Sequence, residues 1–290
     1  MKTAYSDYSL SIRDAFTVVL LCLTLVLIGC GGGGDGGGGG PATGILFGVA
    51  KDIDIGEGKL VTVDVGTGAI STIGVTGLFS VSAIDYDPLT KKLYATGTVN
   101  SQLMLAELDR ITGASNLIAV LTPINGNGNL ASNVADMSFR SDGVLFARPN
   151  NLSFVTINVA DGSTTLLGPN VNSRGNGLTF NSSDTLLHAG PEMTIGGFNS
   201  LEIVNQTDGS RSFLTSLDYS GSLFDAANTL LFPRVGAMDL HVDTGVIYAA
   251  IMVGAGNSAT SFLAILNVTN GTFNYIGAMD EKVDALAWGE

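Results

Sequence analysis

The chain has 290 residues and a formal net charge of −13. A protein this acidic repels nucleic acid and anionic lipid headgroups, so the sequence predicts no nucleic-acid partner and no membrane contact through a basic surface. The two cysteines, Cys22 and Cys30, both lie near the N-terminus. The remaining sequence therefore offers no thiol for a disulfide, a metal site or a nucleophile.

The first 29 residues have the pattern of a signal peptide. A polar segment, 1–14, precedes an unbroken apolar run of 15 residues at 15–29. A transmembrane helix needs about 20 such residues, whereas this length is typical of a signal h-region. The run ends in Leu27-Ile28-Gly29-Cys30, which resembles the lipobox of bacterial lipoproteins. The resemblance implies that Cys30 becomes the lipidated N-terminus; the alternative is an uncleaved anchor.

Residues 31–44, GGGGDGGGGGPATG, follow this cysteine directly. Glycine at such density cannot order, so the segment is predicted to be a flexible coil spanning on the order of 20 Å. Residues 30–44 are therefore interpreted as a lipidated cysteine and a tether that holds a folded domain off a membrane. Gly31 replaces the Asp that marks inner-membrane retention in enterobacteria, which favours the outer membrane of a bacterial cell envelope, with the lipid anchor as the sole membrane contact.

One turn pattern occurs five times between residues 45 and 290. Each copy has an apolar run, then Asp or Asn, then Gly four residues later, then a second apolar run. The Asp or Asn can accept hydrogen bonds from the following backbone, and Gly supplies a positive φ, so each copy predicts a β-hairpin. The first turn positions are Asp64, Asp109, Asn158, Asn205 and Asn267, and the glycines are Gly68, Gly113, Gly162, Gly209 and Gly271.

Two further β-type runs per copy give four strands per unit. The third strand is apolar on both of its faces, as in Leu60, Val61 and Val63, which is typical of a strand covered on both sides. The domain begins on a second-type strand near Ile45 and ends on a first-type strand, Val283–Trp288, so pairing of the two would complete a fifth unit and remove free edges. The sequence predicts an all-β, five-bladed β-propeller over 45–290, closed by that pairing, with a β-sandwich or β-helix as the alternative.

These units resemble the secreted bacterial propeller repeats of the broad YVTN and quinoprotein-like grouping, whose blades read roughly LY-x-x-D-x-x-TG-x-x-T-x-IG. The resemblance covers nearly all of 45–290 and implies the propeller fold. It implies no single activity, because the grouping includes dehydrogenases, lactonases and pure binders. Segments 124–132 and 216–234 are predicted insertions between units, and insertions in repeat proteins often gather on the binding face.

Two groups of carboxylates are candidate metal sites. Asp52 and Asp54 alternate before Gly56, with Glu57 directly after it, which resembles the first half of a Ca²⁺ loop, although the Glu expected at its far end is absent. Asp85, Asp136, Asp239 and Asp284 fall on the predicted innermost strands and are candidates to line the central channel. The structural alternative for Asp52, Asp54 and Glu57 is an ordinary solvated loop. For the carboxylates on the innermost strands it is hydrogen bonding to neighbouring backbone groups. No cofactor is predicted, and Ca²⁺ is the one ion considered.

Only two histidines are present. His188 is aligned with the aromatic position that Tyr94, Phe146 and Tyr248 hold in other units, so it is predicted to replace a core aromatic residue. His241 ends an innermost strand and is the better candidate for a functional histidine. Ser-His-Asp catalysis would need one of them beside a serine and a carboxylate.

The sequence favours a lipid-anchored, non-catalytic binding scaffold that presents loops to a protein or glycan ligand. The scarcity of histidine and the lack of cysteine in the domain support this interpretation. The alternatives are a metal-assisted, lactonase-like hydrolase that uses the channel carboxylates, and a purely structural surface role.

Overall fold

A computed structural model describes residues 44–51, 56–122, 133–150, 153–168, 175–190, 200–220, 233–254 and 259–290. The chain divides into two units, 1–40 and 41–290, and all described residues belong to the second. These residues form strands and turns without any helix, which confirms the all-β class. Within them, accordingly, there is no helix that is long and apolar enough to cross a membrane. The predicted signal peptide, Cys30, the tether up to residue 43, insertion 124–132 and most of insertion 216–234 lie outside the described residues.

The strands form four antiparallel sheets, called A to D here. Sheet A has the order β19-β1-β2-β3-β4-β5-β6, and sheets B, C and D have four strands each. Sheet A contains β1 (Ile45–Lys51), β2 (Glu57–Val63), β3 (Ile70–Tyr86), β4 (Leu93–Val99), β5 (Gln102–Leu108), β6 (Ser115–Val120) and β19 (Val283–Gly289). Sheet B contains β7 (Val134–Phe139), β8 (Leu145–Pro149), β9 (Val155–Ile157) and β10 (Thr164–Leu166). Sheet C contains β11 (Leu178–Phe180), β12 (Leu186–Gly190), β13 (Ser200–Val204) and β14 (Arg211–Ser216), and sheet D contains β15 (Arg234–His241), β16 (Val246–Val253), β17 (Thr260–Leu266) and β18 (Phe273–Met279).

Strand β3 is shared between two groups of sheet A. Its first part, from Ile70 to Val75, pairs with β2, and its last part, from Ala83 to Tyr86, pairs with β4; Phe79 lies between them and pairs with a residue of each, Glu57 of β2 and Thr98 of β4. Register shifts lie between these parts, so the strand changes partner along its 17 residues. The C-terminal strand β19 pairs antiparallel with β1, for example through Phe47 and Ala287. Sheet A therefore consists of two successive four-strand groups.

The repeated turns form the predicted hairpins. In the first of them, Asp64 Oδ1 accepts hydrogen bonds from the backbone N–H groups of Gly66 at 2.9 Å and Thr67 at 2.8 Å. The final glycine of this turn, Gly68, has a φ of +78°, and those of the other four turns lie between +65° and +79°. The sequence prediction of Asx-type turns that end in left-handed glycine is confirmed.

The same glycines also bring neighbouring units into backbone contact. A Cβ atom at Gly271 would lie 1.9 Å from the carbonyl oxygen of Ser216 in β14, and one at Gly209 would lie 2.4 Å from that of Leu167. At Gly68 the nearest atom would be the carbonyl oxygen of Gly277 in β18, at 2.9 Å. Glycine is thus required at these turns for close approach as well as for backbone conformation.

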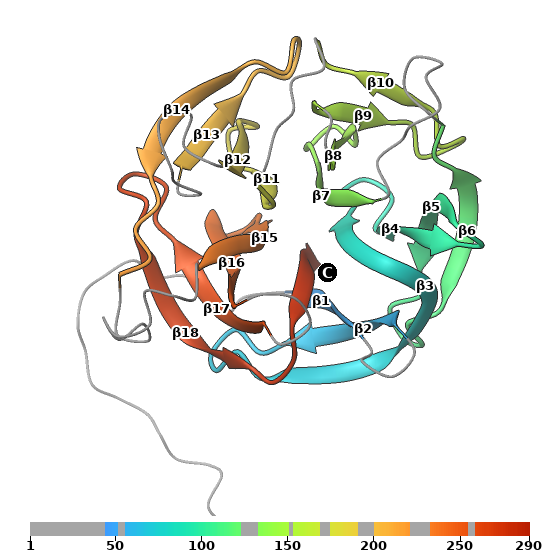
Figure 1. The fold of residues 1–290 in the computed structure, drawn as a ribbon, viewed down its shortest axis with the longest axis horizontal. Coiled ribbons are helices and arrows are strands. Elements are labelled where there is room, and N and C mark those ends of the chain that lie inside the picture. Colours follow the sequence, from blue (N-terminus) through green and yellow to red (C-terminus); the bar gives the residue numbers. More distant parts are fainter. Residues whose placement is uncertain are drawn as a thin grey trace, which may run out of the picture. The chain divides into compact units, whose positions relative to one another are not determined.

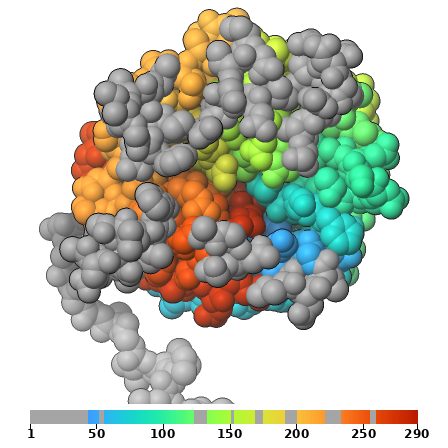
Figure 2. Space-filling model, viewed as in Figure 1, coloured from blue at the N-terminus to red at the C-terminus, as the bar shows by residue number. Residues whose placement is uncertain are grey.

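The strands β3, β7, β11, β15 and β19 pack against one another in that order, and β19 packs against β3 (Figure 1). Segments far apart in the sequence consequently meet around one centre, from the cyan part of sheet A to the red C-terminal strand (Figure 2). Apolar side chains fill the space between facing sheets; between sheets C and D they include Leu187, Leu201, Met238 and Ile251. We call the five strands around the centre the inner strands.

Candidate functional site

Each inner strand contributes one residue at an equivalent register position. Asp85 pairs with Tyr94, Ser138 with Phe146, Thr179 with Leu187 and Asp239 with Tyr248, and in β19 the corresponding residue is Ala287, paired with Phe47. Because the inner strands surround one centre, these five residues come together from positions more than 200 residues apart. Two are carboxylates and two are hydroxyls.

A pocket of about 340 Å³ opens at this position. We call it the axial pocket, because every inner strand contributes to its lining, through Asp85, Ser138, Thr179, Asp239 and Trp288 among others. The turns that follow the inner strands complete it, with Lys91, Asp184 and Glu290 at the rim. Its volume lies in the range of small-molecule sites.

The buried channel carboxylates accept backbone hydrogen bonds from the next inner strand. Asp85 accepts one from the N–H of Phe139 in β7, and Asp239 accepts one from the N–H of Trp288 in β19. Asp136, two residues before Ser138, accepts one from the N–H of Leu178 in β11 at 2.7 Å. These bonds match the structural alternative for the channel carboxylates, and three of them fasten successive inner strands to one another.

Burial governs the ionisation of these three groups. It raises the pKa of Asp239 to about 7, although the Trp288 and Leu240 N–H groups act in the opposite direction. Burial, and then the charge of Asp239, raise the pKa of Asp85 well above its usual value. The pKa of Asp136 is also well above its usual value, again mainly through burial. Carboxyl groups of this kind hold a proton at a pH where ordinary ones are ionised.

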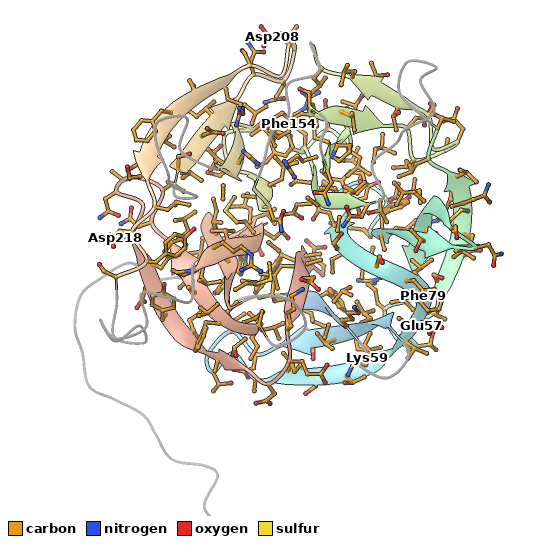
Figure 3. All side chains as sticks on the ribbon, viewed as in Figure 1. Glu57, Lys59, Phe79, Phe154, Asp208 and Asp218 are labelled. Carbon is orange, nitrogen blue, oxygen red and sulfur yellow. The ribbon has the colours of Figure 1, made fainter. Side chains whose placement is uncertain are left out.

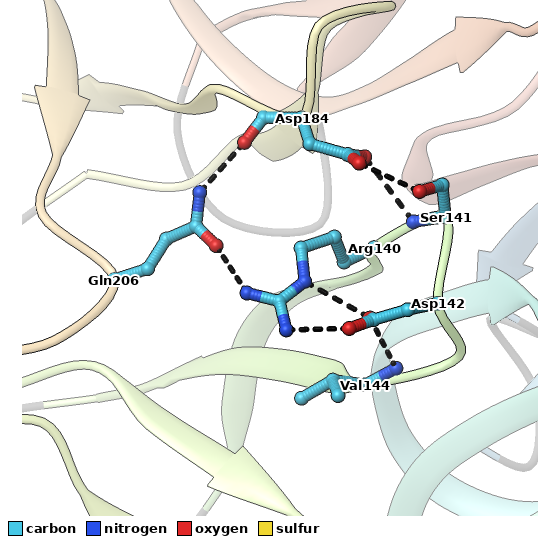
Figure 4. A network of polar contacts seen from close by, with 6 residues as sticks. All are labelled: Arg140, Ser141, Asp142, Val144, Asp184 and Gln206. Atoms are coloured by element: carbon cyan, nitrogen blue, oxygen red, sulfur yellow. Dashed lines mark hydrogen bonds and ion pairs between the residues drawn. The ribbon is translucent and has the colours of Figure 1, made fainter.

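A polar network fixes one side of the pocket rim (Figure 4). Asp184 accepts hydrogen bonds from the Ser141 hydroxyl at 2.6 Å and from its N–H at 3.2 Å, which joins the turns of sheets B and C. Gln206 donates to the carbonyl oxygen of Asp184 at 2.6 Å and accepts from Arg140 at 2.6 Å. Arg140 also forms a two-point ion pair with Asp142. The rim is therefore cross-linked across three turns.

The remaining predicted carboxylates lie elsewhere. Asp284 in β19 forms an ion pair with Lys282 at 2.7 Å and does not line the axial pocket. Glu57 pairs with Phe79 across β2 and β3, at the outer rim of the molecule and away from its centre (Figure 3). Asp52 and Asp54 lie outside the described residues. In the part of the chain that the structure describes, no three His, Cys, Asp or Glu side chains are grouped so as to hold a metal ion. The Ca²⁺ loop therefore stays a prediction.

His241 ends the inner strand β15, as predicted, whereas His188 lies at a different register position from the predicted one. The register of β11 and β12 places Leu187, not His188, at the position of Tyr94, and His188 takes the position of the small residue Ala95. The prediction that His188 replaces an aromatic residue is therefore wrong. The neighbouring Leu186 and Leu187 allow two alignments that differ by one residue, and such a slip reverses which face a side chain occupies.

His241 is buried and stacks on Trp288, with ring centroids 4.0 Å apart. Trp288 stacks in turn on Tyr248 at 5.5 Å. Neither ring nitrogen of His241 has a hydrogen-bond partner among the described residues. Trp288 is itself buried and also lines the axial pocket.

Sequence reasoning missed a buried charged cluster between sheets B and C. We call Arg148, His188, Glu202 and Arg211 the inter-sheet cluster. Glu202 Oε2 lies 3.2 Å from His188 Nδ1 and 3.0 Å from a guanidinium nitrogen of Arg211. The residues that correspond to His188 and Glu202 in the second group of sheet A, Ala95 and Ala106, are both alanine. The sequence signal that could have revealed this cluster is a charged cross-strand pair at a position that is apolar in another unit.

Burial and charge set the pKa values in this cluster. Burial lowers the pKa of His188 to about 4, so the imidazole is neutral at pH 7. Burial, followed by the charge of Arg211, lowers the pKa of Arg148 to about 10. Burial acts to raise the pKa of Glu202, but the His188 hydrogen bond and the neighbouring positive charges outweigh it and leave the pKa below its usual value. This carboxylate is ionised and paired.

No protein-family model matches the chain. The search of curated proteins likewise gives no match. Among solved structures, a chain of a nidogen/laminin complex matches with a TM-score of 0.52 and 8% identity, over 85% of this chain and 98% of that one. TolB from Acinetobacter baumannii matches with a TM-score of 0.46 and 16% identity, over 86% and 67%. A candidate 6-phosphogluconolactonase from Bacteroides uniformis matches with a TM-score of 0.42 and 15% identity, over 81% of each chain. At these identities the first likeness indicates a β-propeller-like fold and nothing about activity.

Proposed function

We propose that this chain is a lipid-anchored protein of the bacterial cell envelope whose five-bladed β-propeller acts as a non-catalytic binding scaffold. The two groups of sheet A together with sheets B, C and D supply the five blades, and the β1–β19 pairing supplies the closure. The observation that carries the binding role is the axial pocket, which has a small-molecule volume and is lined by all five inner strands. A site assembled in this way is rigid, because backbone hydrogen bonds join its walls.

The envelope location rests on the N-terminal sequence. The lipobox-like Leu27–Cys30 and the glycine tether fit a lipidated Cys30, with the outer membrane as the favoured destination. Full-length protein should sediment with membranes and incorporate labelled palmitate, and Cys30→Ala should lose both properties. Palmitate incorporation that survives Cys30→Ala would reject the anchor. Cys22→Ala is the matched control, since this residue lies within the predicted signal peptide.

Thermal melts of the full chain test the binding role. A compound that binds only the folded state raises the melting temperature by mass action. A panel of amino acids, monosaccharides and diamines, each at about 10 mM, should contain at least one class that raises it, since millimolar ligand is enough to report weak binding. A panel without any effect would count against the scaffold.

A metal-assisted, lactonase-like hydrolase is the second candidate. The raised pKa values of Asp85 and Asp239 favour it, because a carboxyl group that is protonated near pH 7 can act as a general acid. Melts with EDTA and with added Ca²⁺ test for the metal, and lactone hydrolysis tests for the activity. A large Ca²⁺-dependent rise together with hydrolysis that Asp239→Asn abolishes would replace the scaffold with this enzyme.

A further inference from the structure

The axial pocket is lined by four carboxylates and one cation. Asp85, Asp239, Asp184 and Glu290 contribute to its walls, and Lys91 is the basic residue among the lining side chains. Lys91 Nζ lies 2.9 Å from Glu290 Oε2, and both side chains are about half exposed. The charges of Lys91 and Glu290 offset each other, and Asp184 adds a further negative charge to the rim. Asp85 and Asp239 therefore reach the pocket with no cationic partner in the described part of the chain.

Ser138 provides a second and independent observation. Its side chain is buried, with 2% exposure, and lines the pocket at the register position that Asp85 and Asp239 hold in their strands. Its hydroxyl has no hydrogen bond with any described residue. This oxygen is not one of the fully buried atoms that lack a partner, so it opens onto the pocket, where a bound molecule can reach it.

We propose that the axial pocket binds the ammonium group of a small organic cation, with Asp85 and Asp239 as counter-charges and Ser138 as a hydrogen-bond acceptor. This inference rests on the proposed function, because it names the class of ligand that the scaffold takes. An ammonium group has three N–H donors and no acceptor, which suits two carboxyl groups and a hydroxyl. Tyr86 and Trp288 also line the pocket, and other side chains already stack on both rings: His241 and Tyr248 on Trp288, and Arg110 over Tyr86.

The geometry favours an organic cation over a divalent metal. The pocket holds about 340 Å³, far more than one ion needs. Asp85 and Asp239 already accept backbone hydrogen bonds, the neighbouring inner strands contribute the hydroxyls of Ser138 and Thr179 at the same register position, and the described residues contain no metal-ligating group of three. A ligand that donates hydrogen bonds and fills space fits this site better.

Titration of the carboxyl groups gives the proposed binding a pH signature. Burial raises the pKa of Asp239 to about 7 and that of Asp85 well above its usual value. Among the described residues, the other titratable groups around them are Tyr86 on β3, Asp136 on β7, Asp184 after β11, His241 on β15, Lys91 after β3 and Glu290 after β19. An ammonium ion binds the ionised form, so binding releases protons. The ionised fraction of a group with a pKa near 7 rises about tenfold from pH 6 to pH 8, and the affinity should rise with it.

A fluorescence titration tests this inference. Trp288 is the sole tryptophan and lines the pocket, so its emission reports occupancy there. The full chain is titrated with 1,4-diaminobutane, with 1,4-butanediol as the uncharged analogue and NaCl as the ionic-strength control. We expect a saturable change with the diamine alone, about tenfold tighter at pH 8 than at pH 6. Calorimetry in two buffers of different ionisation enthalpy should show proton release.

Two variants and two matched controls identify the groups involved. Ser138→Ala removes no hydrogen bond of the free protein and should weaken diamine binding about three- to tenfold, the loss expected for one hydrogen bond. Asp239→Asn should flatten the pH dependence between pH 6 and 8. Ser71→Ala and Asp280→Asn, at exposed positions, should leave binding unchanged. If Asp239→Asn fails to fold, Ser138→Ala and the proton release still decide the matter.

Three results would overturn the inference: no saturable response to the diamine, equal binding of the butanediol, or unchanged binding in both Ser138→Ala and Asp239→Asn. Binding of uncharged compounds alone would support the binding role of the scaffold and would reject only the cationic class of ligand. An absence of response to every compound, in this titration and in the melts, would count against the scaffold as well.

Discussion

Buried carboxyl groups occur in two regions of this protein, with opposite surroundings. Between sheets B and C, Glu202 lies beside His188 and Arg211, and its pKa is below the usual value. At the axial pocket, Asp85 and Asp239 have backbone N–H groups and other carboxyl groups for neighbours, and their pKa values are raised. All three residues are at most 7% exposed. Burial is therefore common to both regions, and the presence or absence of a cation decides the difference.

The comparison also extends to packing. Among the described residues, the apolar cluster between sheets B and C holds seven buried side chains, from Phe146 to Val204, whereas the one between sheets C and D holds fourteen. The inter-sheet cluster occupies space that apolar side chains fill elsewhere. Charged groups at such a position are tolerated only when they are paired, since an unpaired buried charge is costly. The inter-sheet cluster is complete within the chain, whereas the axial carboxyl groups lack a cation that a ligand can supply.

The largest expected effect comes from breaking the paired region. Glu202→Ala leaves Arg211 and His188 buried without their common partner, and removal of one member of a buried ion pair costs about 3–5 kcal/mol. Urea denaturation at pH 7 measures the free energy of unfolding. A loss below about 1 kcal/mol, the range of an exposed pair, would show that the cluster adds no more than surface charges do.

Removing the charge of Asp239 at the axial pocket should raise the free energy of unfolding, whereas Glu202→Ala lowers it. The pKa of Asp239 is raised from 3.8 to about 7, so between these values the folded state holds a proton that the unfolded state has released; the free energy of unfolding falls as the pH rises through this range, and the full loss is present above pH 7. Asp239→Asn keeps an acceptor for the Trp288 N–H without the charge. The variant should be more stable than the parent protein at pH 8, by up to about 4 kcal/mol, and nearly equal to it at pH 4. A less stable variant at pH 8 would contradict this account.

In the inter-sheet cluster, His188 should make the folded state less stable as the pH falls, the reverse of the effect of Asp239. The pKa of His188 falls from 6.5 to about 4 on folding, so between these values the unfolded state binds a proton that the folded state does not. The free energy of unfolding should therefore fall by about 3 kcal/mol through this group as the pH drops from 7 to 4. Because Asp239 works in the opposite sense over the same range, the measurement compares the parent with His188→Gln at each pH. Parallel curves for the two proteins would refute the assignment.

The smallest effect is expected where a carboxylate is paired but exposed. Glu107 Oε2 lies 2.8 Å from Lys92 Nζ, and the lysine side chain is 47% exposed. Solvent screens such a pair, so Glu107→Gln should change the free energy of unfolding by less than about 1 kcal/mol, and added salt should reduce the difference further. An effect as large as that of Glu202→Ala would mean that burial does not determine how much an ion pair contributes to the free energy of unfolding.

The sequence by itself determined the local structure. The Asp or Asn and Gly at fixed spacing, as in Asp64 and Gly68, predict the hairpins because side-chain acceptors and positive φ act within five residues. The alternation of apolar runs likewise predicted short antiparallel strands. The strands β1 and β19 fall where the sequence placed the first and last of them.

Only the tertiary structure decided which side chains meet. The axial pocket joins Asp85, Ser138 and Asp239, and the inter-sheet cluster joins Arg148 to His188. These contacts depend on register, where a shift of one residue moves a side chain to the other face of its sheet, as it did for His188. They depend also on the order in which sheets follow around the centre. Burial and charge pairing, and hence the pKa values, arise from those long-range contacts and are not encoded in any single stretch of the chain.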